Sequence, residues 1–584
     1  MSNLVQITIN GKKIQVEKGT SVLKAADAVG IDIPRLCFLE GIHEEGNCRL
    51  CVVEIKGQKG LKPSCRTEVY EGMEVVTESK KIFNYVSMNL ELLASNHHFE
   101  CFKCSREENC EFLDLLRAYS VGNEFSDLFG FQVKDMHLND SSDAMILDSS
   151  KCILCGRCVS ACEKMTGLGI LNFNQRGTET YVGPALYHPL EDSGCIYCGK
   201  CIQACPTGAI REQDDIKTLE YALRDPEKTV VVQVAPSVRS ALGEEFGYPI
   251  GTNVEGKMYS ALKALGFDEI IDTNFTADLT IIEEGTELLD RIRHGGVLPM
   301  FTSCSPGWVN YLETYAPDFI PNVSSCKSPQ QMAGALIKSY YADQLKVDKK
   351  DIVSVSIMPC VAKKHEAKRP EMGRDGIQDV DIVLTTREFG RLVRRRNIDF
   401  KKLKPSKPFG QLAKYTGAAA IFGASGGVME AALRTVSELL MGDSAPLEFM
   451  EVRGKENIKE ATYKINDLDL NIAVVHGGVG IKQFLDMVRT GEKQYHFVEF
   501  MGCIGGCING GGQPIIKAKE LAKIDVIKER SKVLYDIDQK ATFRKSHQNP
   551  AIQKLYEEYL SKLSHYQLHG LLHTHYHERG RYSK

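Results

Sequence analysis

The hydrophobic pattern at the start of the chain has a period of two. The segment VQITINGKKIQVEKG places apolar residues at every second position on both sides of an Asn10-Gly11 pair, which predicts two strands joined by a tight turn. The next segment, TSVLKAADAVG, has the pattern of a short helix. Thr20 or Ser21 would cap this helix and Gly30 would end it. We therefore expect a small sheet with one helix at the N-terminus.

Further along the chain, apolar residues form continuous runs instead. Such runs are typical of strands buried on both faces, and helical segments such as GKMYSALKALG and GGVMEAALRTVSELL separate them. This alternation predicts an α/β domain with parallel sheets, whose sites lie at the carboxyl ends of the strands. Cys360 and Cys503 stand at two such ends. The expected strands cover residues 229–236, 351–360, 381–386, 471–478 and 495–503.

Composition suggests the number of domains and excludes some classes of partner. The 584 residues are 43% hydrophobic and 25% charged, which suggests about three or four globular domains. A formal net charge of −4 gives no general reason to expect nucleic acid or an anionic membrane as a partner. The N-terminus lacks the pattern of a signal peptide, and no apolar run reaches the roughly 18 residues that span a bilayer. We expect a cytoplasmic protein.

The 20 cysteines are too many for an ordinary cytoplasmic enzyme. Disulfides are rare in a reducing compartment, so clustered cysteines indicate metal binding or catalysis. Fifteen of them lie between Cys37 and Cys205, and only five are spread over the rest of the chain. The chain therefore divides into a cysteine-dense front and a larger body.

Residues 1–80 carry the first set of metal ligands. Four thiolates suit a [2Fe–2S] cluster, although the plant-type spacing would put four residues in the first gap, where this chain has ten. The strand pair, helix and cysteine loop resemble a ferredoxin β-grasp domain. The alternative is a structural zinc site, which we disfavour because zinc ribbons usually use two C-x2-C pairs. The four candidate ligands are Cys37, Cys48, Cys51 and Cys65.

Residues 81–125 combine one histidine with three cysteines. The set could hold zinc, but its place between two iron–sulfur domains favours a [4Fe–4S] cluster with one histidine ligand. A neutral imidazole in place of a thiolate would raise the potential of the cluster. His98 is the neighbouring candidate. The favoured ligands are His97, Cys101, Cys104 and Cys110.

Residues 126–215 contain the pattern C-x2-C-x2-C-x3-C twice, as in bacterial two-cluster ferredoxins. In that pattern the fourth cysteine of each run binds the cluster of the other run. Glu163 replaces the proline that usually follows the first run. One [4Fe–4S] cluster is expected on Cys152, Cys155, Cys158 and Cys205. The other is expected on Cys195, Cys198, Cys201 and Cys162.

The sequence contains few motifs for chemistry other than iron–sulfur binding. The chain has no GxxxxGK[ST] phosphate loop and no dinucleotide fingerprint, and we interpret HGGVG (476–480) as a turn. RLVRRR (391–396) is interpreted as a solvated helix face and not as a nucleic-acid patch, and a docking surface for an acidic electron donor is a further alternative. Near the C-terminus four histidines recur four residues apart, which fits a polar tail that binds metal adventitiously or a transition-metal site. They are His565, His569, His573 and His577.

Three segments of the body resemble the signatures of [FeFe] hydrogenases. They are FTSCSPGW (301–308), MPCVAKKHE (358–366) and EFMGCIGGCINGGGQP (499–514), which correspond to TSCCPxW, MPCxxKxxE and ExMxCxxGCxxGGGQP in that family. The resemblance covers nearly the whole chain, because the front clusters match the clostridial multi-cluster type. It implies a multidomain α+β and α/β fold. Ferredoxin-like β-grasp and two-cluster modules would precede a two-lobed α/β catalytic domain at residues 216–584.

The resemblance also implies an H-cluster, a [4Fe–4S] cubane joined to a two-iron unit with CO, cyanide and azadithiolate. Cys360, Cys503 and Cys507 would hold the cubane, and Cys507 would bridge to the two-iron unit. Lys363 would donate a hydrogen bond to a cyanide. The pocket would be lined by Ala235, Pro236, Ser237, Gln330, Met358, Phe422 and Met501.

The family's proton route maps onto this chain. It would run from Cys304 through Glu284, Ser324 and Glu287 to Arg291 at the surface. The implied reaction is the reversible reduction of protons to H2 by a monomeric enzyme. Ferredoxin or flavodoxin would exchange electrons at the front clusters, and dedicated maturation proteins would install the two-iron unit.

Ser305 departs from the family, which has a cysteine ligand of the cubane there. The serine could bind as an alkoxide, which we favour, or the loop could slip so that Cys304 binds. Alternatively the cubane is unstable, or Cys326 substitutes, although a small buried residue is the favoured interpretation of Cys326. An unstable cubane would make the chain an inactive variant or a redox or H2 sensor. An electron-carrier subunit related to NADH dehydrogenase would explain residues 1–215 only.

Overall fold

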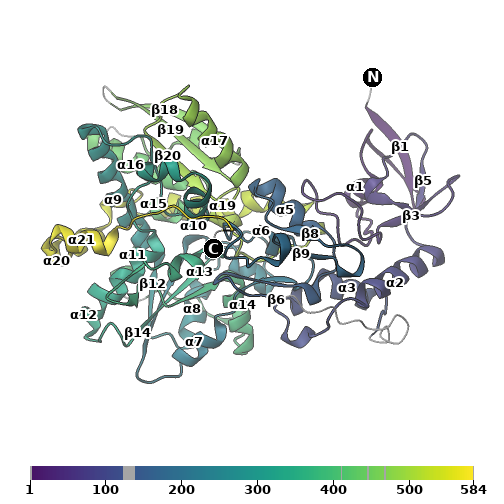
Figure 1. Ribbon diagram of the computed structural model, residues 1–584, viewed down its shortest axis with the longest axis horizontal. Helices are drawn as coiled ribbons and strands as arrows, with labels where there is room; N and C mark the ends of the chain where they lie inside the picture. The colour runs from purple at the N-terminus through teal and green to yellow at the C-terminus, as the bar shows by residue number, and fades with distance from the viewer. Residues whose placement is uncertain are drawn as a thin grey trace.

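The fold is taken from a computed structural model. The structure describes residues 3–122, 138–408, 411–442, 446–454, 456–465 and 468–582, so the predicted boundary at residues 125–126 lies outside the described residues. In Figure 1 the N-terminal domain lies at one end and the α/β body at the other, with the two-cluster segment between them. No helix among the described residues is long and apolar enough to cross a membrane.

The N-terminal domain has the predicted sheet and helix. Strands β1 (Leu4–Ile9) and β2 (Lys12–Glu17) pair antiparallel, and Asn10 and Gly11 turn between them with φ of 48° and 80°. The Ser21 hydroxyl caps α1 (Val22–Ala28) by accepting from the Lys24 amide at 3.3 Å. The sheet order is β2-β1-β5-β3-β4. The other strands are β3 (Val52–Ile55), β4 (Lys62–Pro63) and β5 (Glu74–Val76).

Two helices and a second small sheet connect this domain to the body. Helix α2 (Lys80–Ala94) and helix α3 (Glu111–Ala118) share a core with the loops that carry Cys37 and Cys48. The two-cluster segment has the sheet β10-β7-β6 and two short helices, each of which follows a glycine with positive φ inside a cysteine run. Its elements are β6 (Leu138–Asn139), β7 (Met145–Asp148), α5 (Arg157–Thr166), β8 (Asn172–Asn174), β9 (Tyr181–Gly183), α6 (Lys200–Ala204) and β10 (Ile210–Glu212).

The body contains two sheets of four strands. The first has the order β12-β11-β14-β17 and is entirely parallel, as predicted for continuous apolar runs. The second has the order β13-β20-β19-β18 and includes one antiparallel pair, β18–β19, which the parallel prediction did not include. The strands are β11 (Thr229–Val234), β12 (Glu269–Asp272), β13 (Met300–Phe301), β14 (Ile352–Met358), β17 (Ile382–Thr385), β18 (Ile458–Ile465), β19 (Leu468–His476) and β20 (Phe497–Met501).

Helices cover both sheets, and the chain ends in a helical segment. The interpretation of HGGVG as a turn was wrong in part, because a helix already starts at Gly478. Main helices of the body are α7 (Ile216–Ala222), α8 (Glu255–Leu265), α9 (Thr273–His294), α10 (Pro306–Tyr315), α11 (Pro329–Leu336), α12 (Ala342–Leu345), α13 (Ala362–Lys368), α14 (Thr386–Arg395), α15 (Gly417–Ala420), α16 (Gly427–Met441), α17 (Gly478–Thr490), α18 (Ala518–Leu521), α19 (Val526–Lys540), α20 (Pro550–Glu558) and α21 (His565–Leu572).

Candidate active site and electron path

A cavity lies at the carboxyl ends of β14 and β20, between the two sheets of the body. The space free of protein atoms there is about 750 Å³, part of it open to solvent. Every residue that the sequence predicted to hold or surround the H-cluster lines it. These residues are Ala235, Pro236, Ser237, Cys304, Ser305, Gln330, Met358, Cys360, Lys363, Phe422, Met501, Cys503 and Cys507.

The three cysteines of the cavity fit a metal cluster. Burial, together with the charge of Cys503, raises the pKa of both Cys360 and Cys507 to about 12. Such thiols stay protonated near neutral pH unless a metal replaces the proton. A glycine-rich loop brings them together: a Cβ on Gly510 would lie 2.3 Å from the Pro359 carbonyl oxygen. Only glycine allows this approach.

The loop that carries Ser305 is fixed on both sides. The Trp308 side chain is fully buried, and its Nε1 donates to the Thr302 carbonyl at 3.0 Å. Helix α10 starts directly after Ser305, at Pro306. The Ser305 hydroxyl accepts from the Gly502 amide at 3.1 Å, which holds it beside the cysteine loop. A slip that replaced Ser305 by Cys304 would have to break these contacts.

Lys363 lines the cavity with its ammonium group already held by protein. Its Nζ donates to Glu366 Oε2 at 2.8 Å, to the Ser328 hydroxyl at 2.8 Å and to the Cys304 carbonyl at 3.2 Å. The sequence analysis did not predict that Ser328 and Glu366 hold the Lys363 ammonium group. Their contacts keep a cation in a buried place, where an isolated charge would be costly.

The predicted proton-route residues lie together. Helix α9 carries Glu284, Glu287 and Arg291 at positions i, i+3 and i+7, so they share one face. The Ser324 hydroxyl donates to Glu287 Oε2 at 2.8 Å, and Arg291 Nη2 donates to Glu287 Oε1 at 2.6 Å. The charge of Glu284 contributes to the raised pKa of the Cys304 thiol, after burial. The set leads from the cavity to the partly exposed Arg291.

Glu284 has the environment of a carboxylic acid that keeps its proton. Its side chain is 1% exposed, and Oε2 has no hydrogen-bond partner among the described residues. Burial, followed by the charge of Glu287, raises the Glu284 pKa to about 8. The carboxyl is therefore mostly protonated at neutral pH and can pass a proton on.

The two ferredoxin-type runs come together as the crossed pattern predicts. One small cavity is lined by Cys152, Cys155, Cys158 and Cys205. For the second set, burial raises the pKa of Cys201, and the neighbouring cysteines raise it further. Those neighbours are Cys198, Cys195 and Cys162.

The histidine-containing set also surrounds a small cavity. His97, Cys101, Cys104 and Cys110 line it. The Nδ1 atom of His97 is buried without a hydrogen-bond partner among the described residues, and burial lowers the His97 pKa to about 4. A neutral ring with an unpartnered nitrogen is the form that binds metal. His98, the other candidate, lines the same cavity but faces Glu100 at 3.7 Å.

The four cysteines of the N-terminal domain are close enough to interact as two pairs. A hydrogen bond from Cys37 lowers the pKa of Cys48 to about 6, and a hydrogen bond from Cys65 lowers that of Cys51. Such a compact, buried thiol set suits a [2Fe–2S] cluster.

The two-cluster segment touches the active-site loop directly. A Cβ on Gly511 would lie 2.2 Å from the Cys198 carbonyl oxygen and 2.7 Å from the Gly199 Cα. Burial, and after it the charge of Cys503, raises the pKa of Cys198, so these two sites are neighbours. The second ferredoxin-type cysteine set therefore lies next to the cavity.

Lys200 lies at this gap, and sequence reasoning missed it. Its side chain is 4% exposed, and its Nζ donates to Gln203 at 2.7 Å and to the Asn509 carbonyl. Burial lowers the Lys200 pKa, whereas the charges of Cys503 and Cys198 act against this shift. The signal was available, since Lys200 stands inside the CIYCGKC run.

We expect Lys200→Met to lower the reduction potential of the adjacent [4Fe–4S] cluster, because the cation favours the more negative reduced state. The effect should be on the order of 1 kcal/mol. An EPR-monitored redox titration measures it. Lys200→Arg should keep the potential near its original value, and Lys217→Met, at an exposed position, is the matched control. An unchanged potential in Lys200→Met would contradict this role.

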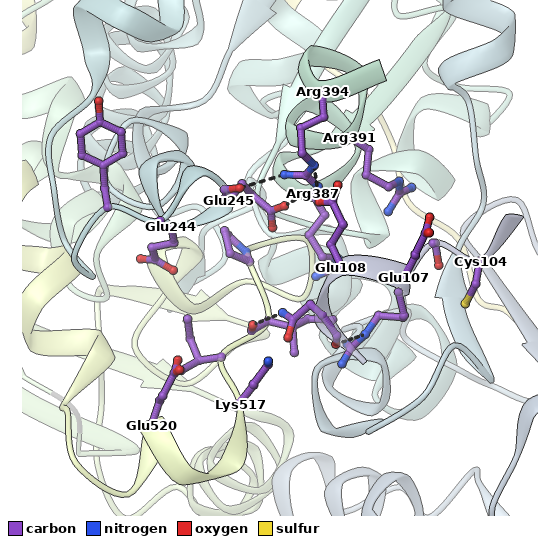
Figure 2. A pocket seen from close by; sticks show the side chains of 18 of the residues that line it. Cys104, Glu107, Glu108, Glu244, Glu245, Arg387, Arg391, Arg394, Lys517 and Glu520 are labelled. Atoms are coloured by element: carbon purple, nitrogen blue, oxygen red, sulfur yellow. Dashed lines mark hydrogen bonds and ion pairs between the residues drawn. The ribbon is translucent and has the colours of Figure 1, made fainter. Parts of the chain in front are cut away.

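The arginine-rich segment forms one wall of a hollow beside Cys104 (Figure 2). Arg391 pairs with Glu212 at 2.9 Å, and Arg394 pairs with Glu108 at 2.5 Å and with Glu245 at 3.1 Å. The interpretation as a solvated helix face was therefore wrong for these residues, which join the body to the front domains. Acidic and basic groups alternate around the hollow, so it is not a simple basic patch.

Cys326 is a fully buried residue, as favoured, and it does not line the cavity. Its Sγ lies 3.9 Å from Glu287 Oε2, beside the predicted proton-route residues. It is therefore not placed to replace Ser305.

Comparison with known proteins agrees with this architecture. Residues 228–511 match the family model described as the C-terminal domain of the iron only hydrogenase large subunit. Other models match a 2Fe-2S binding domain at residues 2–80, an iron–sulfur region of NADH-ubiquinone oxidoreductase at 87–124, a 4Fe-4S dicluster domain at 140–209 and an iron hydrogenase small subunit at 524–579.

Relatives match over nearly the full chain. Iron hydrogenase 1 of Clostridium pasteurianum is 43% identical over 98% of this chain and 99% of its own. A subunit of an NADP-reducing hydrogenase from Solidesulfovibrio fructosivorans is 44% identical over 99% of this chain and 100% of its own. A solved [FeFe] hydrogenase of Chlamydomonas reinhardtii is 39% identical with a TM-score of 0.56, and the match covers 63% of this chain and all of that one.

The fold and site thus define an iron–sulfur oxidoreductase with accessory clusters in front of a catalytic domain. The chain belongs to the [FeFe] hydrogenases. An electron carrier without the catalytic body is excluded, because the body itself matches this family.

Proposed function

We propose that the chain catalyses the reversible reduction of protons to H2 with electrons from ferredoxin or flavodoxin. The electrons would pass through one [2Fe–2S] and three [4Fe–4S] clusters to the cavity between the two sheets. The observation that carries this proposal is that all predicted H-cluster contacts line one cavity, which adjoins the second ferredoxin-type site at Gly511. When bound, the H-cluster would supply the iron site at which protons and electrons combine.

The chain's own residues would hold the cluster and move protons. Cys360, Cys503 and Cys507 would be its thiolate ligands, and Ser305 would provide an oxygen in the fourth position. The Lys363 ammonium would face the two-iron unit. A positioned acid outperforms bulk water as a proton donor, and Cys304 beside Glu284 is so placed.

A second candidate function is a redox or H2 sensor, and Ser305 is the observation that favours it. An oxygen ligand is harder than the thiolate that such clusters prefer, so the cubane could be altered or lost. The described proton route speaks for turnover, because a sensor without catalysis has no need for a buried acid leading to the surface.

Catalysis and the electron donor can be tested together. Protein with its two-iron unit installed should evolve H2 anaerobically from reduced viologen and from reduced ferredoxin. We expect no H2 from NADH or NADPH alone, since the sequence has no flavin or nicotinamide site. Evolution from viologen but not from ferredoxin or flavodoxin would contradict the donor assignment only. The absence of H2 with every donor, despite full cluster content, would favour the sensor.

A further inference from the structure

A group of metal-ligating side chains lies at the outer end of the proposed proton route, apart from all cluster sites. The Glu287 carboxylate, the Cys326 thiol and the His573 ring each bring one ligand atom within 4.8 Å of the other two. Carboxylate, thiolate and imidazole are the three protein ligand types that Zn²⁺ accepts. Tetrahedral bonds of about 2.0–2.3 Å need ligand atoms roughly 3.3–3.8 Å apart, so small side-chain rotations would complete the site.

The fold holds the two halves of this group together across a long stretch of chain. Cys326 and His573 form an antiparallel bridge. The Lys327 amide donates to the Leu572 carbonyl at 2.8 Å, and the Thr574 amide donates to the Ser325 carbonyl at 2.7 Å. His573 is thus a packed residue at the end of α21, and the interpretation of this region as a polar tail does not describe it.

The three ligand atoms lie close together, but each also has protein partners that an ion would have to replace or share. Arg291 binds Glu287 Oε1, whereas Oε2 accepts from the Ser324 hydroxyl at 2.8 Å and from the Ser325 amide at 3.1 Å and hydroxyl at 3.3 Å. The same Oε2 lies 3.9 Å from the Cys326 sulfur. His573 Nδ1 lies 2.9 Å from the Ser325 hydroxyl, and Nε2 lies 3.4 Å from Glu283 Oε2. Whichever ring nitrogen binds the metal, the other retains an oxygen partner, as metal-binding histidines usually do.

The site also has an entrance and an attractive charge. Cys326 is fully buried, but the side chains of His573 and Glu287 are 14% and 17% exposed. The exposed His569 ring stacks on His573 with 4.8 Å between ring centres. A metal ion could therefore meet His569 at the surface before it reaches His573. The carboxylates of Glu287 and Glu283 and the potential thiolate of Cys326 lie around the site, and Arg291 pairs with Glu287.

We propose that Glu287, Cys326 and His573 bind Zn²⁺ or a similar divalent transition-metal ion, and that the bound ion blocks the proton route from outside. Glu287 Oε2 faces Cys326 and also accepts the hydrogen bond from Ser324 at 2.8 Å. A metal bound to this oxygen would compete with the hydrogen bond from Ser324. The proton route would then lack the link between Ser324 and Glu287, the residue that pairs with Arg291 near the surface. The claim that the ion blocks the route rests on the proposed function. The claim that an ion binds rests on the geometry alone.

The test uses the holoenzyme, in which the cluster cysteines are occupied. With one equivalent of Zn²⁺, zinc K-edge EXAFS should show one Zn–S bond of about 2.3 Å beside nitrogen and oxygen ligands. Cys326→Ser should lose the Zn–S bond and need about 10–100-fold more Zn²⁺ for half-inhibition of H2 evolution. EDTA should restore the rate. His565→Gln, on the exposed start of α21, is the matched control and should behave like the unmodified protein.

The outcomes separate the two halves of the proposal. A Zn–S bond that is missing, or that persists in Cys326→Ser, overturns the site. A Zn–S bond that depends on Cys326, with H2 evolution unaffected by Zn²⁺, overturns the block and leaves the site. Cys326→Ser without added metal should keep the cluster EPR spectra of the unmodified protein, which checks its folding independently of the rate.

Discussion

Glu284→Gln is expected to lower H2 evolution by about 10²–10⁴-fold, the usual contribution of a positioned acid or base. Glutamine has nearly the same shape and is neutral, like the protonated acid, but it cannot release a proton. The cavity and the clusters should therefore be undisturbed while the route is cut. H2 evolution from reduced viologen measures the loss, and EPR spectra of the clusters should remain unchanged.

The pH dependence follows from the raised pKa of Glu284. Between the ordinary pKa near 4.5 and the buried value of about 8, the folded protein retains a proton that an exposed carboxyl would release. H2 evolution should therefore fall as the pH rises through about 8, and this step should be absent from the residual activity of Glu284→Gln. Asp290→Asn, at an exposed position of the same helix, is the control. Full activity in Glu284→Gln would remove this residue from the route.

Ser305→Ala is expected to cost at least about 10–100-fold in H2 evolution, because it removes the oxygen next to the cysteine loop. Ser305→Cys should remain active and should raise the reduction potential of the cubane. A thiolate is a softer donor than an alkoxide, so it stabilises the oxidised iron less. EPR-monitored titration of protein that carries the cubane without the two-iron unit reads this potential directly.

The three forms of residue 305 decide between the candidate functions. If Ser305→Ala matches the unmodified protein in both spectrum and rate, the serine is not a ligand. If only Ser305→Cys evolves H2, the serine disables the site and the sensor becomes the better interpretation. The buried Trp308, which donates to the Thr302 carbonyl, and the start of α10 at Pro306 should keep the loop backbone the same in all three forms.

Local patterns predicted strands β1 and β2 and the body strands β11, β14, β17, β19 and β20, but not β12, β13 or β18. Of the 22 residues that line the cavity, 13 were predicted. The period of two around Asn10-Gly11 and the continuous apolar runs are properties of neighbouring residues, so they can be read from the sequence. The cysteine runs have a spacing that chance rarely produces. The predicted residues of the cavity came from the family resemblance, not from periodicity, and five of them lie outside the three signatures. They are Ala235, Pro236, Ser237, Gln330 and Phe422.

The features that were missed depend on contacts between distant parts of the chain. Arg391 looked solvated because nothing near it in sequence reveals Glu212 as its partner. The bridge between Cys326 and His573 joins a loop of the body to the end of the last helix. The role of Lys200 depends on its contact with the Asn509 carbonyl, which is far away in the sequence. Sequence periodicity carries no information on such pairings.

The glycine contact between residues 199 and 511 constrains how the molecule can change. Two backbones meet there with no side chain between them, so the main chain alone sets how closely the two-cluster segment approaches the loop of the cavity. A side chain at either position would push the two segments apart. Substitutions at these two glycines should therefore disturb the fit between the segments, although neither residue is a predicted metal ligand.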